Sequence, residues 1–196
     1  MTEIFHGSFT QQDPIPEDAI AAALAVLNHG RLHRYNTAEG EVAQAALLEE
    51  DFARQTDAFT LAPVPGAIAA VGATPIYVGV TEDLVIDLDD LQSKLSETKR
   101  GARVLLLSHM RGHICDMDRL MALCNAAEVT VIEDCAHTMG AAWNGVPSGR
   151  WGKFGCFSTQ TYKHVNSGEG GLLISDDADG MARAIMLSGS YMLFDK

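Results

Sequence analysis

The chain has 196 residues, enough for one domain with a sizeable core, and its 47% hydrophobic and 20% charged residues are typical of a globular protein. Its formal charge of −12 at pH 7 would repel a phosphate backbone, so nucleic acid is not an expected partner. No apolar run reaches the length of a membrane span and the N-terminus has no signal-peptide core, so we expect a cytoplasmic protein without membrane contact.

The first part of the chain predicts helices. Residues 17–28 combine alanine and leucine at helical spacing with acids at the start, and His29-Gly30 ends the pattern. Residues 41–55 predict a second amphipathic helix, and residues 66–73 a short buried one between proline- and glycine-marked segments.

From residue 75 onward, apolar strands alternate with amphipathic helices. The predicted strands are 75–80, 103–109, 129–134, 154–159 and 171–177, and the predicted helices are 88–97 and 116–127. Such alternation indicates an α/β fold with a mostly parallel sheet flanked by helices. Ligands of these folds bind outside the carboxyl ends of the strands, so the residues after each strand are the first candidates for a site.

Metal binding is not expected. The four cysteines form no CxxC pair, and reduced, mostly buried thiols are the simpler interpretation. His109 and His113 are four residues apart, which on a helix would make half a metal site, but the MRG between them predicts a loop.

Three chemically active side chains follow predicted strands. Asp134 ends one strand, Ser158 ends the next, and Lys163 comes five residues later. Each also has a structural explanation: the acid as a helix N-cap, the hydroxyl as a satisfied polar group and the lysine as a surface charge. The glycine-rich segment 168–171 with Glu169 matches neither a P-loop nor a dinucleotide fingerprint, and we interpret it as a structural turn.

Taken together, an acid, a hydroxyl and a lysine in this order fit a pyridoxal phosphate site. A lysine that forms a Schiff base must lie near the aldehyde and be partly deprotonated. An acid beside the pyridine nitrogen keeps it protonated, so that the ring withdraws electrons from the substrate. A hydroxyl near the lysine can hold the phosphate.

The stretch VIEDCAHTMGAAWNGVPSGRWGKFGCFSTQTYKHVNSGEGG, residues 131–171, resembles the DegT/DnrJ/EryC1/StrS family of sugar aminotransferases. The family pattern E-D-x-A-[QH], G-A, G, G-x-x-G, F-S, K and G-E-G-G is present in order, and weaker similarity covers most of residues 15–190. The resemblance implies the large domain of fold-type-I pyridoxal phosphate enzymes, here a single incomplete cofactor-binding domain over 1–196.

The resemblance also implies a role for four residues. Lys163 would carry the Schiff base and shuttle the proton, and Asp134 would pair with the pyridinium nitrogen. His137 would lie beside the ring, and Ser158 would hold the phosphate. The implied reaction is transfer of an amino group from glutamate or glutamine to a keto sugar, usually nucleotide-linked, or to a cyclitol, in a homodimer. Some relatives with histidine at the lysine position are dehydratases, so lysine here favours transamination.

The chain departs from the family pattern in three ways. Residues 52–57 run directly into 58–61, so the strand and Ser-Gly-Thr turn of the phosphate cup are missing, and the sheet should have exposed edges. Leu61 stands where relatives place an aromatic residue on the ring. The chain also stops before the small C-terminal domain. Two explanations stay open: part of an active enzyme, or a truncated non-catalytic homologue that acts as a partner or scaffold subunit.

Overall fold

The computed structural model describes residues 14–30, 76–97, 104–167 and 170–188, together with 38, 42, 47, 48, 51, 54 and 59–61. The chain divides into two units, Met1–Gln44 and Ala45–Lys196, and each is described by itself. The single domain expected over 1–196 stays a prediction.

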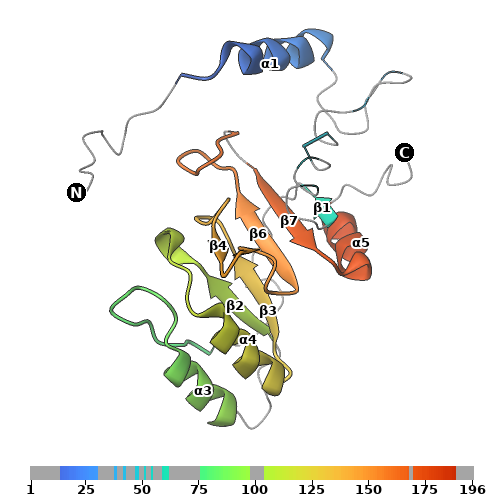
Figure 1. Cartoon of the computed structure of the whole chain (residues 1–196). Helices are drawn as coiled ribbons and strands as arrows, with labels where there is room; N and C mark the ends of the chain where they lie inside the picture. Colours follow the sequence, from blue (N-terminus) through green and yellow to red (C-terminus); the bar gives the residue numbers. More distant parts are fainter. Residues whose placement is uncertain are drawn as a thin grey trace, which may run out of the picture. The chain divides into compact units, whose positions relative to one another are not determined.

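The first unit contains helix α1, Glu17–His29, at the position predicted from residues 17–28 (Figure 1). Acidic Glu17 and Asp18 lie in its first turn, where negative charge favours the helix dipole. Gly30 ends the helix in a left-handed conformation with φ 70°, and its N–H donates to the carbonyl of Val26. The helix therefore begins and ends for the reasons that its sequence indicated.

The second unit is built on a five-stranded sheet in the order β1-β7-β6-β3-β2 (Figure 1). Its strands are β1 Phe59–Leu61, β2 Val104–Ser108, β3 Thr130–Asp134, β6 Phe154–Ser158 and β7 Gly171–Ser175. The pairs β2–β3 and β3–β6 are parallel, whereas β7 is antiparallel to both β6 and β1. Only β7 therefore runs against the other four strands, and the expected α/β fold with a mostly parallel sheet is confirmed.

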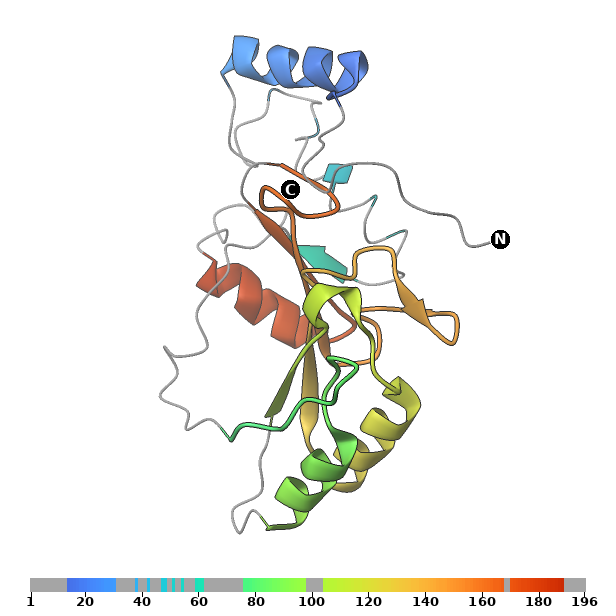
Figure 2. The same ribbon diagram turned by 90° about the vertical axis from the view of Figure 1, so that its left-hand side faces the viewer.

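Helices cover both faces of this sheet (Figure 2). Helices α3, Leu88–Glu97, and α4, Met117–Ala126, contribute the buried Leu91, Met117 and Leu120 to a core that also contains Val131 of β3. Helix α5, Ala178–Leu187, packs its Met181 and Ile185 against the opposite face, near Phe154 and Leu173. The core thus fixes both layers relative to the strand ends.

A side-chain cap begins both α4, which the sequence predicted, and α5, which it did not. The side chain of Asp116 accepts from the N–H of Arg119 at the start of α4, and Asp177 accepts from the N–H of Gly180 at the start of α5. Lys153 contacts the Asp177 carboxylate at 2.8 Å. Its hydrogen bond and that of Gly180 lower the pKa of Asp177, so this carboxylate stays charged while it caps the helix.

The predicted strand at 75–80 is wrong over its described residues. Residues 76–79 have no regular structure, and Val80 forms only an isolated bridge to Ile86. The chain folds back on itself here: the N–H of Thr81 donates to the carbonyl of Val85 at 2.9 Å, and Leu84 is left-handed with φ 62°. Local pairing therefore replaces pairing with the sheet.

Other differences involve short or undescribed segments. The predicted helix 66–73 lies outside the described residues, and of 41–55 only four helical positions, 47, 48, 51 and 54, are described. Strand β1 and the hairpin of β4, Ala142–Trp143, and β5, Val146–Pro147, were not predicted. With two or three residues each, they are too short to show an alternating pattern.

The described part of the sheet has an exposed edge, as the sequence predicted. Strand β2 ends the sheet on one side, and its Val104 and Leu106 are 55% and 46% exposed.

In the part of the chain that the structure describes, no helix is long and apolar enough to cross a bilayer.

Gly155 in β6 is needed because the backbone of another segment passes directly against it. A Cβ atom there would lie 2.5 Å from the Cα and 2.6 Å from the carbonyl oxygen of Gly149. We expect Gly155→Ala to destabilise the fold by about 3 kcal/mol, since overpacking against backbone cannot be relieved by a rotamer change. Urea unfolding followed by circular dichroism measures this loss.

Gly145→Ala is the matched control. Gly145 is left-handed, with φ 79°, and a Cβ atom added there would meet nothing within 4 Å. The cost should be only about 1 kcal/mol, from backbone conformation alone. Equal losses for the two variants would contradict the close packing of Gly149 on β6.

Candidate active site

Asp134 lies at the carboxyl end of β3 and is held there by two hydrogen bonds. Its Oδ2 accepts from the hydroxyl of Ser108 on β2 at 3.1 Å, and its Oδ1 accepts from the N–H of Ala136 at 3.1 Å. A turn follows rather than a helix, so Asp134 is not a helix N-cap. The two donors fix a half-buried carboxylate at the strand end, where it can pair with a cation.

His137 and Lys163 lie in direct contact. The distance from the lysine Nζ to the histidine Nε2 is 2.7 Å, and the other ring nitrogen, Nδ1, accepts from the backbone N–H of Arg111 at 2.9 Å. Both side chains are partly buried. Lys163 is thus an oriented amine, and the interpretation as a free surface charge does not apply.

Ser158 ends β6, the strand next to β3. Its Oγ accepts a hydrogen bond from the N–H of Gln160 at 3.3 Å, which leaves the hydroxyl able to donate to an anion. Asp134 pairs in register with Cys156, two residues before Ser158. The predicted acid and hydroxyl therefore lie on adjacent strands at the same edge of the sheet.

Three loops at this edge are joined by hydrogen bonds. The loop after β2 donates the N–H of His109 to the carbonyl of Asp134 at 3.1 Å and the N–H of Arg111 to His137. The loop after β3 reaches Lys163, which follows β6, through His137. The structure thus brings the predicted His137 and Lys163 into contact and places Asp134 and Ser158 at adjacent strand ends. Glu169 lies outside the described residues.

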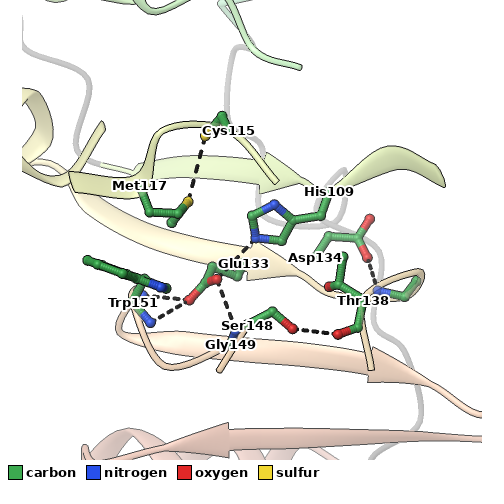
Figure 3. Close-up of polar contacts among 11 residues, drawn as sticks. His109, Cys115, Met117, Glu133, Asp134, Thr138, Ser148, Gly149 and Trp151 are labelled. Carbon is green, nitrogen blue, oxygen red and sulfur yellow. Dashed lines mark hydrogen bonds and ion pairs between the residues drawn. The ribbon is translucent and has the colours of Figure 1, made fainter. Parts of the chain in front are cut away.

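Glu133 is a residue whose importance the sequence interpretation missed. It is fully buried, with 0% exposure, and its carboxylate accepts from three backbone N–H groups: Gly149 at 2.9 Å, Trp151 at 2.8 Å and Gly152 at 2.7 Å. His109 Nε2 lies 3.1 Å from the same carboxylate (Figure 3). Strand alternation could have revealed it, since Glu133 shares the core-facing side of β3 with the buried Val131.

A possible metal-binding group is formed by His109, Glu133 and Cys135. One nitrogen, one oxygen and one sulfur atom from these side chains lie within 4.8 Å of one another. The oxygens of Glu133 already accept the bonds described above, and burial raises the pKa of the Cys135 thiol well above its usual value. A thiol must lose its proton to bind a metal. This group is therefore better explained as a structural clasp that joins β3 to the loop 148–152.

The residues at the sheet edge match the groups of pyridoxal phosphate one for one. The amine of Lys163 suits its aldehyde, the carboxylate of Asp134 its pyridine nitrogen and the hydroxyl of Ser158 its phosphate. For the phosphate, Ser158 is the only one of the predicted site residues with a suitable hydroxyl. The donor set therefore fits the cofactor, most completely at the aldehyde and the ring.

An open, mostly parallel α/β sheet with a lysine, a histidine and an acid at its carboxyl edge is the arrangement expected for the large domain of a fold-type-I protein. A sequence profile of the DegT/DnrJ/EryC1/StrS aminotransferase family matches residues 56–192. The chain belongs to this family, as its sequence motifs predicted.

Two curated relatives illustrate the similarity. The L-glutamine:scyllo-inosose aminotransferase of Streptomyces griseus is 36% identical over 118 residues, which cover 60% of this chain and 27% of the relative. The GDP-perosamine synthase of Escherichia coli O157:H7 is 31% identical over 124 residues, covering 63% of this chain and 33% of the relative. The chain spans about a third or less of the length of these relatives.

Solved structures agree with this fold. AtS13 from Actinomadura melliaura has a TM-score of 0.74 and 26% identity, over 89% of this chain and 55% of that one. The aminotransferase from Psychrobacter cryohalolentis has a TM-score of 0.73 and 24% identity, over 87% of this chain and 50% of that one. Spr1654 from Streptococcus pneumoniae, solved in a PLP form, has a TM-score of 0.72 at 21% identity and covers 89% and 55% of the two chains. The second and third likenesses concern the fold alone.

Proposed function

We propose that this chain carries the cofactor-binding site of a pyridoxal-phosphate-dependent aminotransferase that acts on a keto sugar. The contact of Lys163 Nζ with His137 Nε2, at the carboxyl edge beside Asp134, is the observation that carries the proposal. Membership of an aminotransferase family supports it.

Each residue has a defined task in this proposal. Lys163 would hold the cofactor through its aldehyde and would move the proton of the transfer with its Nζ. Asp134 would keep the ring nitrogen protonated, and Ser158 would donate its hydroxyl to the phosphate. When bound, the cofactor acts as an electron sink that lets an amino group pass from one carbon to another.

The substrates follow from the relatives and belong to the proposal. Relatives named for L-glutamine and for inososes support glutamine as donor and a cyclitol ketone as acceptor. A relative named GDP-perosamine synthase supports a nucleotide-linked keto sugar as the acceptor, and glutamate is the alternative donor in the proposal. A homodimer and a cytoplasmic location stay predictions.

A single-turnover experiment tests this function. The full chain is loaded with pyridoxal phosphate and mixed with L-glutamine or L-glutamate, and the keto acid released is measured by mass spectrometry. We expect about one keto acid per chain, followed by an aminated product when a nucleotide-linked keto sugar or an inosose is added. A bound cofactor without keto acid would instead support the non-catalytic partner subunit, and loss of water from the sugar without amination would support a dehydratase.

Asp134→Asn is the matched variant for the same assay. The amide keeps the size of the side chain and can still accept from Ala136, so the melting temperature should change little. It cannot hold the positive charge of the ring nitrogen. We expect keto acid release to slow by about 100-fold, the scale on which a fixed electrostatic partner assists catalysis. An unchanged rate would rule out the assigned role of Asp134.

A further inference from the structure

The turn that follows β2 has an unusual backbone. Arg111 is left-handed, with φ 57° and ψ 21°, although it is not a glycine, and Gly112 follows with φ 84°. The turn is closed by the N–H of Gly112, which donates to the carbonyl of His109 at 3.1 Å. A left-handed non-glycine residue costs about 1–2 kcal/mol, so the surrounding contacts must hold it in place.

The contact that this backbone makes is with His137. The N–H of Arg111 points at Nδ1 of the imidazole at 2.9 Å, and a Cβ atom on Gly112 would lie only 3.2 Å from the His137 carbonyl oxygen. The turn thus approaches His137 so closely that a larger residue at 112 would crowd it. The donor is the backbone N–H of residue 111, so only a substitution by proline would remove it.

This donor determines where the proton of the imidazole lies. A nitrogen that accepts a hydrogen bond must carry a lone pair, so Nδ1 of His137 is unprotonated. A neutral imidazole keeps one N–H, which then belongs to Nε2. Nε2 is the atom 2.7 Å from the Nζ of Lys163, so the histidine is the donor of that bond.

The amine must therefore be the acceptor. An ammonium group has three N–H donors and no lone pair, whereas a neutral amine can accept one hydrogen bond. We propose that the backbone N–H of Arg111 selects the Nε2–H tautomer of His137, and that His137 in turn favours the neutral form of the Lys163 amine by donating an exchangeable hydrogen bond to its lone pair. We call these two hydrogen bonds, from Arg111 to His137 and from His137 to Lys163, the relay. Arg111 and His137 are its positioning residues.

The purpose of the relay depends on the proposed function. A neutral amine is the nucleophilic form of lysine, and the proposed covalent link to an aldehyde requires it. A histidine oriented by a fixed backbone donor therefore raises the share of Lys163 that is able to react. The protonation states themselves are properties of the chain alone and can be measured without cofactor.

The first test is nuclear magnetic resonance on the full cofactor-free chain with ¹⁵N-labelled histidine. We expect the ring of His137 near neutral pH to show an unprotonated Nδ1 and a protonated Nε2. A ring protonated at Nδ1, or at both nitrogens, would overturn the relay. This measurement needs no variant, so it holds even if a substitution impairs folding.

The second test measures the reactivity of Lys163 by trace acetylation at one fixed pH, with peptide mass spectrometry as readout. Lys153, which is paired with Asp177, serves as the reference within the same molecule. We expect His137→Leu to slow the labelling of Lys163 relative to Lys153 on the order of tenfold, because the amine loses the donor that stabilises its neutral form. Equal relative rates in both proteins would contradict the proposal.

Two further variants separate this relay from a general packing role. His137→Gln offers an amide oxygen to Arg111 and an amide N–H to Lys163, so labelling should recover to within about threefold of the original rate. Arg111→Ala keeps the backbone N–H and should leave the rate unchanged, whereas a change would assign the effect to the guanidinium charge. If these results are obtained but pyridoxal phosphate does not bind, the proposed function is wrong and the relay is still supported. If pyridoxal phosphate binds but His137 carries its proton on Nδ1, the relay is wrong and the proposed function is still supported.

Discussion

Lys163→Ala is expected to abolish covalent capture of pyridoxal phosphate and to lower aminotransferase turnover by more than about 10³-fold. The loss is large because one amine both binds the cofactor and moves the proton. Stability should fall by only about 1 kcal/mol, the scale of the single hydrogen bond between Nζ and His137. Steady-state kinetics and thermal unfolding of the variant measure the two effects separately.

Lys153→Ala is the control for this experiment. Lys153 precedes β6 at the opposite end of the strand, and its half-exposed side chain pairs with Asp177 rather than with a residue of the site. Its loss should leave turnover within about twofold of the original, since exposed ion pairs contribute little. Similar losses of turnover in both lysine variants would contradict the assignment of Lys163.

Glu133→Ala is expected to destabilise the fold by about 3–5 kcal/mol, because several donors lose their acceptor at once and each unsatisfied buried donor costs about 1–3 kcal/mol. The truncation leaves three backbone N–H groups and His109 without the carboxylate that accepts from them or contacts them. Urea unfolding of the two proteins under the same conditions gives the difference in free energy.

Two control variants, Glu133→Gln and Asp176→Ala, show whether the loss of stability comes from the buried hydrogen bonds of Glu133. The glutamine keeps the volume but turns one oxygen into a donor, so it should lose part of the same hydrogen bonds and fall between the two proteins. Asp176 is paired with Arg150 on the surface with a 71% exposed side chain, and its removal should cost about 1 kcal/mol or less. A Glu133→Ala variant as stable as Asp176→Ala would show that the clasp on loop 148–152 does not support the fold.

The parts of the fold that the sequence predicts well are those with a strong local signal. Helix α4 combines an Asp116 cap with apolar residues at helical spacing, and the prediction of 116–127 agrees with Met117–Ala126. The segment 75–80 has the apolar composition of a strand, yet the carbonyl of its Gly79 accepts from the N–H of Asp87, and the Gly79 N–H donates to the side chain of Asp90. Composition cannot distinguish a strand that joins the sheet from one that folds back locally.

The site shows the same division. The placement of Asp134, His137, Ser158 and Lys163 at or after the ends of two neighbouring strands could be predicted because each belongs to a spaced motif, and their roles stay predictions. The role of Arg111 could not, because the interacting group is a backbone N–H whose direction depends on a left-handed turn. Tertiary geometry, rather than residue type, places that donor against the histidine.

Covalent trapping of the cofactor on the full chain tests the central claim most directly. The protein is mixed with pyridoxal phosphate, followed by visible absorbance, reduced with borohydride and digested for mass spectrometry. We predict a single modified lysine, Lys163, and loss of that adduct in Lys163→Ala. A folded chain that carries no adduct on Lys163, or an equal yield of adduct in the alanine variant, would contradict the account.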